Sequence, residues 1–241
     1  ATLTESGNIE ESELELRFIH ALRKYIERRK SIVGYHFEDR MNNGTKEYLF
    51  TLPIEDGKIT YTIIPQYELG EVHGVALNTR TDFFIQCTGL EIGGETITDP
   101  NKLMAYMNIA LYLDGYTWHA HKDNIRFYDD LDKRREINET PDIQSWSLTW
   151  DDVDRFSKDQ GPGEDNIETL DELFNNPKKY KKARADISKL PASKDVLDDL
   201  RVSNNSIERL LWYLTRSNDS MSLLKEVGLY FASFQKDDIK D

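Results

Sequence analysis

The chain contains 241 residues, of which 38% are apolar, 11% are aromatic and 31% are charged, and its formal net charge at pH 7 is −13. This length is sufficient for a full hydrophobic core, and the composition is typical of a globular protein. No run approaches the roughly 18 consecutive apolar residues of a membrane span, and the acidic amino terminus is unlike a signal peptide, so we expect a cytoplasmic protein with no membrane partner.

The first part of the chain predicts a helix followed by an antiparallel β meander. Apolar residues recur at spacings of three and four between residues 10 and 30, and Ser12 with Glu15 has the form of a capping box. Strands are predicted at residues 35–37, 47–53 and 58–66. The sequences at residues 42–44 and 56–57 supply turns that tolerate positive φ.

The next segments predict a mixed sheet. Strands are expected at residues 80–87 and 106–114, separated by a Gly- and Thr-rich loop at residues 89–100. The single cysteine, Cys87, fits a buried, inert thiol in the first of these strands. A charged helix (122–139), a strand (144–149) and a short helix (150–157), which Thr149 and Asp152 would cap, complete an α/β domain with helices flanking a mixed sheet.

The last third of the chain is expected to be a helical appendage. Residues 158–168 lose apolar periodicity and are rich in Gly, Pro and acids, which indicates a linker. The expected organisation is therefore an α/β domain at residues 1–157, a linker at 158–168 and a helical region at 169–241 that packs on the first domain. Helices are predicted at residues 167–174, 177–189, 193–202, 206–215 and 220–234.

Two carboxylates stand in apolar, β-prone runs. Asp82 opens one run, and Asp114 closes another just before Gly115. An ionised carboxylate in such a run is costly unless a partner or a metal holds it. Magnesium binds one or two carboxylates together with water and phosphate oxygens, so two neighbouring strands with one acid each could form a magnesium or manganese site.

Three other residues could reach the same edge of the sheet. Gln66 ends a third strand, Glu15 lies on the first helix, and His119 follows the turn after Asp114. An imidazole has an unperturbed pKa of roughly 6.5, which suits proton transfer near neutrality. Each residue also has an ordinary structural interpretation: a hydrogen-bonded strand end for Asp82, a turn for Asp114, a cap or solvated position for Glu15 and His119, and backbone pairing for Gln66.

These residues resemble the very-short-patch-repair branch of the PD-(D/E)XK nucleases over roughly residues 12–156. The resemblance rests on Glu15, on Thr-Asp-Phe-Phe at residues 81–84, on Leu-Asp-Gly-Tyr-Thr-Trp-His at residues 113–119, and on the segments 130–135 and 146–152. The chain looks most similar to the nuclease-like domain at the carboxy end of large bacterial DEAD/DEAH-box helicases, some of them in phage defence. The first residue, Ala1, fits a segment of such a longer protein.

The resemblance implies a restriction-endonuclease-like mixed β-sheet, DNA as substrate, magnesium or manganese as cofactor, and the helicase motor region of the same parent chain as partner. It implies that Asp82 is the principal metal ligand, that Glu15 orders the attacking water, and that His119 acts on the phosphate. Asp114 stands where the family has its first histidine or a lysine, and it would join Asp82 as a metal ligand. Candidate contacts to DNA are Gln66, Arg126, Lys133 and Arg134.

Three features, one of them the acid Asp114 in place of a lysine, point to an alternative in which the fold is catalytically degenerate and positions DNA or docks a protein. Tyr112 stands where the family has its second acid. The net charge of −13 opposes DNA binding, which depends on Lys and Arg at phosphates, unless a larger parent delivers the DNA. A third interpretation is a protein-interaction domain that does not bind DNA.

Overall fold

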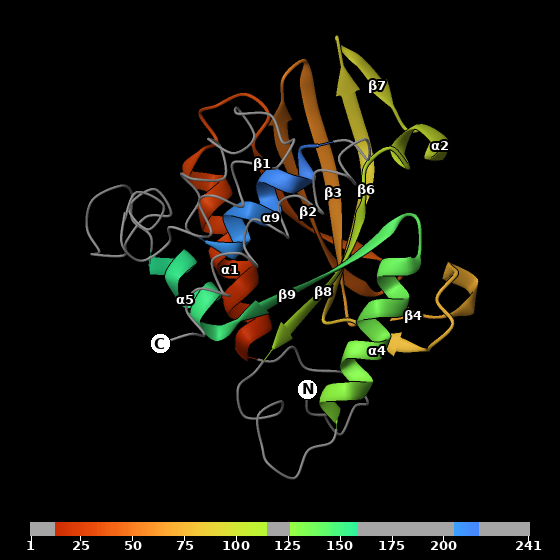
Figure 1. Cartoon of the computed structure of the whole chain (residues 1–241). Coiled ribbons are helices and arrows are strands. Elements are labelled where there is room, and N and C mark those ends of the chain that lie inside the picture. Colours follow the sequence, from red (N-terminus) through yellow and green to blue (C-terminus); the bar gives the residue numbers. More distant parts are fainter. Residues whose placement is uncertain (1–12, 115–125, 159–204, 217–241) are drawn as a thin grey trace, which may run out of the picture. The chain divides into compact units, whose positions relative to one another are not determined.

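The computed structural model describes residues 13–114, 126–158 and 205–216 of the chain (Figure 1). The chain divides into two units, Ala1–Lys158 and Asp159–Asp241. The described helices of the first unit are α1 (Glu13–Arg28), η1 (Glu71–His73, a 3-10 helix), α2 (Pro100–Leu103), α4 (Arg126–Glu139) and α5 (Trp150–Lys158). The strands are β1 (His36–Asn42), β2 (Thr45–Ile54), β3 (Gly57–Pro65), β4 (Glu68–Leu69), β5 (Thr79–Arg80), β6 (Phe83–Ile92), β7 (Glu95–Ile97), β8 (Asn108–Asp114) and β9 (Ile143–Thr149).

The main sheet of the first unit has the strand order β1-β2-β3-β6-β8-β9, and β7 pairs with β6. All of its pairs are antiparallel except β8 with β9, which is parallel because α4 carries the chain back between the two strands. The predicted meander at β1 to β3 is confirmed, and so is the α/β fold class with a mixed sheet flanked by helices. No helix among the described residues is long and apolar enough to cross a membrane.

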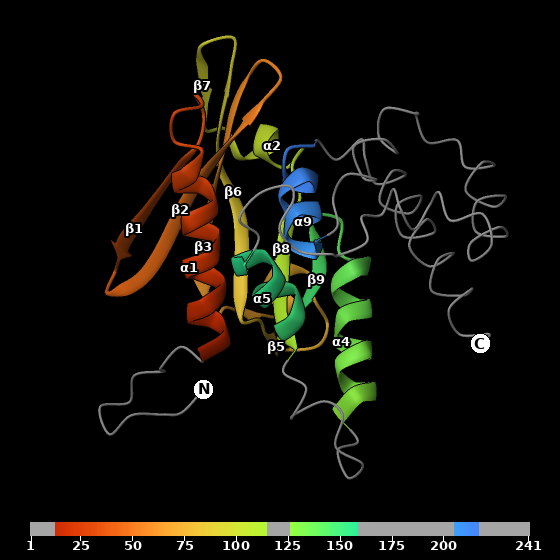
Figure 2. The same ribbon diagram turned by 90° about the vertical axis from the view of Figure 1, so that its left-hand side faces the viewer.

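Helices cover both faces of this sheet. Phe83 and Phe84 are consecutive on β6 and therefore point to opposite faces. Phe83 lies 5.5 Å from the ring of Phe18 on α1, whereas Phe84 belongs to the core cluster that contains Ile137 of α4. Figure 2 accordingly shows α1 and α4 on either side of β6 and β8. The unit thus has a helix, sheet, helix arrangement.

The predicted apolar stripe of α1 is its buried face. Leu14, Phe18, Ala21, Leu22 and Ile26 are all buried, as the spacings of three and four predict. The aromatic ring of Tyr25 lies 5.1 Å from Phe156, which packs α1 against α5. Helix α5 starts with the predicted cap: Asp152 accepts hydrogen bonds from the backbone and hydroxyl of Thr149 (2.8 and 2.9 Å), and its own N–H donates to the Thr149 hydroxyl (3.2 Å).

Two local predictions are wrong. The loop expected at residues 89–100 contains the end of β6, the whole of β7 and the start of α2, because Gly93 and Gly94, both at positive φ (58° and 83°), make a tight turn within a hairpin. Gly57 is not a positive-φ turn residue. It opens β3, and a Cβ there would lie 1.7 Å from the carbonyl oxygen of Glu91, so glycine is required by close backbone approach.

In the second unit the structure describes one helix, α9 (Ser206–Leu214). This matches the helix expected at residues 206–215. Asn205 caps it by accepting a 2.7 Å hydrogen bond from the N–H of Ile207. Its predicted apolar stripe, Ile207, Leu210, Leu211 and Leu214, is buried. The other helices expected after residue 158, and all of the expected linker except Lys158, lie outside the described residues.

Candidate functional site

Two predicted site residues, Gln66 and Asp82, lie side by side at one end of the sheet. Pro65, the last residue of β3, pairs with Phe83, the first residue of β6. Gln66 and Asp82 directly adjoin this pair, and the backbone N–H of Gln66 donates to the carbonyl oxygen of Asp82 at 2.9 Å. The end of the β3–β6 ladder therefore fixes both residues, although they are far apart in sequence.

Gln66 connects this strand end to Glu15. Its φ of 52° is in the left-handed region, so the chain turns out of the strand direction at this residue. The side-chain amide donates a 2.9 Å hydrogen bond to Oε1 of Glu15 on α1. Glu15 is only 2% exposed and lies in the first turn of α1, where the helix dipole favours a carboxylate. A solvated helix position for Glu15 is thereby excluded.

The carboxylate of Asp82 is hydrogen-bonded to the backbone of strand β8. Its Oδ2 accepts a 2.6 Å hydrogen bond from the backbone N–H of Leu113, and the residue is partly buried. A hydrogen bond from an N–H to a charged oxygen is short and strong, so it favours the ionised carboxylate at this position. Asp82 consequently meets β8 between Tyr112 and Asp114.

Tyr112 occupies the position next to Asp82 as a neutral phenol. Burial raises the pKa of Tyr112, and the negative charges of Asp82 and Asp130 raise it further. The 3.2 Å hydrogen bond with the hydroxyl of Thr79 and the positive charge of Arg134 lower it. The guanidinium carbon of Arg134 lies 5.0 Å from the centroid of the Tyr112 ring. Position 112 of β8 therefore places a neutral phenol, and no carboxylate, beside Asp82.

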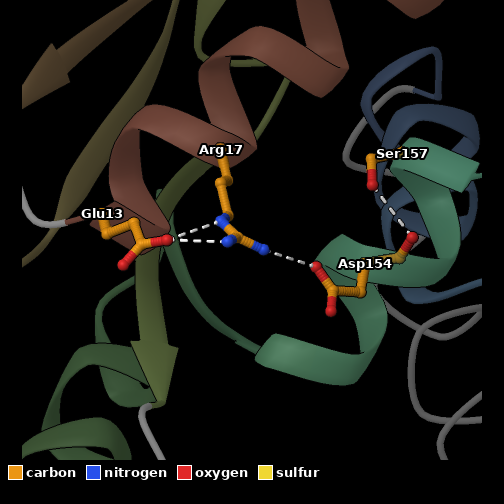
Figure 3. Close-up of polar contacts among 4 residues, drawn as sticks. All are labelled: Glu13, Arg17, Asp154 and Ser157. Atoms are coloured by element: carbon orange, nitrogen blue, oxygen red, sulfur yellow. Dashed lines mark hydrogen bonds and ion pairs between the residues drawn. The ribbon is translucent and has the colours of Figure 1, made fainter.

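The first turn of α1, which carries Glu15, is attached to α5 by Arg17. Figure 3 shows the guanidinium of Arg17 between the carboxylates of Glu13 (2.7 Å) and Asp154 (3.1 Å). The same guanidinium lies 5.1 Å from the Trp150 ring. These groups are largely exposed, so solvent screening keeps the contribution of each ion pair to stability small. Together the contacts join the first turn of α1 to α5.

Several predicted site residues are placed only in part. Asp114 is the last residue of β8 and pairs with Thr149 of β9, but its side chain lies outside the described part of the structure. His119 lies outside the described residues. Arg126 is the first residue of α4, again without a described side chain, and Lys133 is a partly buried residue of the same helix. The convergence of Asp114 and His119 with Asp82 therefore stays a prediction.

One expected helical ion pair of α4 is present: Arg135 bonds Asp132 at 3.2 Å. Arg134 packs over the ring of Tyr112. Within residues 13–114, 126–158 and 205–216, no group of three or more His, Cys, Asp or Glu side chains could hold a metal ion. The contacts that unite Thr79, Tyr112 and Arg134 were not predicted, because no local pattern links residues on β5, β8 and α4.

No protein-family model matches this chain, and no curated protein or solved structure is similar to it.

Proposed function

We propose that this chain is the nuclease domain of a larger, helicase-type protein and that it hydrolyses phosphodiester bonds of DNA with the help of magnesium or manganese. The observation that supports this most is the meeting of Glu15, Gln66 and Asp82 at one end of the mixed sheet. The sequence resemblance assigned Glu15 and Asp82 to one site, and the strand pattern placed Gln66 at the same edge of the sheet.

The donor chemistry at this sheet end fits a hard divalent cation. Asp82 would hold the metal, with Asp114 as the second ligand, because Mg²⁺ and Mn²⁺ prefer carboxylate oxygens. The hydrogen bond from Leu113 occupies one acceptor position of Asp82, and a carboxylate offers about four such positions. The metal, when bound, would supply positive charge that stabilises the phosphodiester as negative charge develops on it.

The chain's own residues have distinct roles in this proposal. The N–H of Leu113 holds the Asp82 carboxylate in place. Glu15, oriented by the Gln66 amide, accepts a hydrogen bond from the attacking water and turns it toward phosphorus. His119 donates to the phosphate or carries a proton. The net charge of −13 supports a context in which another part of the parent protein delivers the DNA.

The test is nicking of supercoiled plasmid DNA by the purified full chain in the presence of manganese. Asp82→Asn keeps an oxygen that can accept from Leu113 but removes the charge, so nicking should fall at least about 100-fold. Glu15→Gln should reduce nicking by a similar factor. Asp132→Asn is the matched control, because Asp132 is an exposed aspartate that pairs with Arg135. Absence of nicking by the wild-type chain contradicts the proposal.

A second candidate function is a non-catalytic module that positions DNA or docks a protein for the motor region. Tyr112 favours it, because a neutral phenol stands where the resembled nucleases have their second acid. This function predicts no nicking with any divalent metal, together with retention of DNA that Asp82→Asn leaves unchanged. If the chain neither nicks nor retains DNA at low salt, both functions are excluded and a protein-interaction domain is favoured.

A further inference from the structure

The guanidinium of Arg134 packs on the aromatic ring of Tyr112. Its guanidinium carbon is 5.0 Å from the centroid of the Tyr112 ring, a distance at which an arginine is attracted to the face of an aromatic ring. The far end of the ring is fixed by the 3.2 Å hydrogen bond between the hydroxyls of Tyr112 and Thr79. Tyr112 also packs against the core cluster that contains Ile137 of α4. Both the ring and the helix that carries Arg134 are thus held by the core.

The positive charge of Arg134 and the negative charge of Asp82 both act on the hydroxyl of Tyr112. Asp82 is bonded to the N–H of Leu113, the residue after Tyr112. The guanidinium therefore packs on the residue that directly precedes the N–H bonded by Asp82, the carboxylate that the proposed nuclease would use. An arginine keeps its charge at every physiological pH, so this place always carries a cation.

We infer that Arg134 binds a backbone phosphate of DNA next to Asp82, and that Tyr112 is the positioning residue that sets the direction of its guanidinium. The inference rests on the proposed function for its location at the cleavage site. The planar fork of an arginine fits two oxygens of one phosphate. Because the ring already orders the side chain, less conformational entropy is lost on binding.

The helix distinguishes Arg134 from its basic neighbours. Consecutive residues of a helix point about 100° apart, so Lys133 and Arg135 point in other directions. Arg135 is exposed and pairs with Asp132 at 3.2 Å. Asp130 lies one turn before Arg134 on the same face of α4. Its negative charge repels a phosphate, as the charge of Asp82 does. Of these three basic residues, Arg134 is therefore the one that the ring of Tyr112 orients.

The experiment measures binding of a fluorescent DNA duplex to the full chain over a series of salt concentrations, once with EDTA and once with calcium. Neither condition requires cleavage, so the result is independent of nuclease activity. The variants are Arg134→Gln, Arg134→Lys, Tyr112→Phe and Tyr112→Leu, with Arg135→Gln as the matched control. Thermal unfolding of each variant confirms that it is folded.

Arg134→Gln should weaken binding about 10-fold and lower the slope of log Kd against log salt by about 1, the value for one lost phosphate contact. Arg134→Lys should restore the slope while recovering only part of the affinity. Tyr112→Phe keeps the ring and should bind as the wild type does, whereas Tyr112→Leu should weaken binding about threefold or more.

Two results overturn the inference. One is a salt slope for Arg134→Gln that equals the slope for Arg135→Gln, and the other is absence of DNA binding by the wild-type chain in both conditions. If binding depends on Arg134 but the chain does not nick DNA, the nuclease proposal fails and the phosphate contact remains.

Discussion

The hydrogen bond between Gln66 and Glu15 should appear as a coupling free energy between two residues that are far apart in sequence. Glu15 is 2% exposed and accepts a 2.9 Å hydrogen bond from the Gln66 amide. Hydrogen bonds to charged groups contribute about 1.5–3 kcal/mol to stability. Glu15→Leu removes the carboxylate, and Gln66→Met removes the amide while keeping a long side chain. The double-mutant cycle should therefore give a coupling of about 1.5–3 kcal/mol.

The assay is equilibrium urea unfolding of the full chain, followed by far-UV circular dichroism for the wild type, both single variants and the double variant. The matched control cycle uses Glu13→Leu where the first cycle uses Glu15→Leu. Glu13 is an exposed residue of the same helical turn and pairs with Arg17. Its coupling to Gln66→Met should be near zero. If the Glu15 cycle gives a coupling within about 0.5 kcal/mol of the Glu13 cycle, the contact that assembles the candidate site is refuted.

Three further predictions concern the scaffold. Gly57→Ala should destabilise the fold by about 1–3 kcal/mol or more, because the added Cβ would lie 1.7 Å from the carbonyl oxygen of Glu91. Urea unfolding measures this loss, and an unchanged midpoint would contradict the close approach of β3 to β6. Burial raises the pKa of Cys87 to about 11, so the native thiol should react with iodoacetamide far more slowly than the urea-unfolded thiol at about pH 8. The pKa of the Cys87 thiol is higher in the folded than in the unfolded chain, so folding becomes less favourable as pH rises from about 8.5 to about 11. The wild type should therefore lose more stability over this range than Cys87→Ala, and equal losses would refute this. Arg17→Met should leave the midpoint of thermal unfolding nearly unchanged, because the pairs of Arg17 with Glu13 and Asp154 are exposed and screened by solvent. A marked fall in the midpoint would contradict this.

Local periodicity was sufficient to predict the elements whose burial follows a simple repeat. Spacings of three and four predict the buried stripe of α1, and the pair Thr149 and Asp152 predicts the cap of α5. The parallel pairing of β8 with β9 could be expected only from the order of elements, because a helix between two strands allows a parallel crossover. Residues 89–100 were interpreted as a loop because β7 is only three residues long and its turn glycines dominate the local composition.

The site was predicted in part for a comparable reason. Glu15 and Asp82 could be grouped because a family motif relates them, and Gln66 could be added because it ends a predicted strand that could reach the same edge. The placement of Tyr112 under Arg134 depends on how α4 packs on β8, and nothing in either segment alone encodes that contact. Gly57 illustrates the same limit: a glycine after Asp56 predicts a turn, whereas its actual requirement is set by Glu91 on another strand.

Crystals soaked with manganese show whether Asp82 belongs to a divalent-metal site at the end of the sheet. Manganese scatters anomalously, so its position can be assigned without reference to the protein atoms. We expect an anomalous peak within about 2.3 Å of an oxygen of Asp82, which disappears in crystals of Asp82→Asn. Density for manganese elsewhere only, or none beside Asp82 at saturating metal, would exclude Asp82 as a metal ligand.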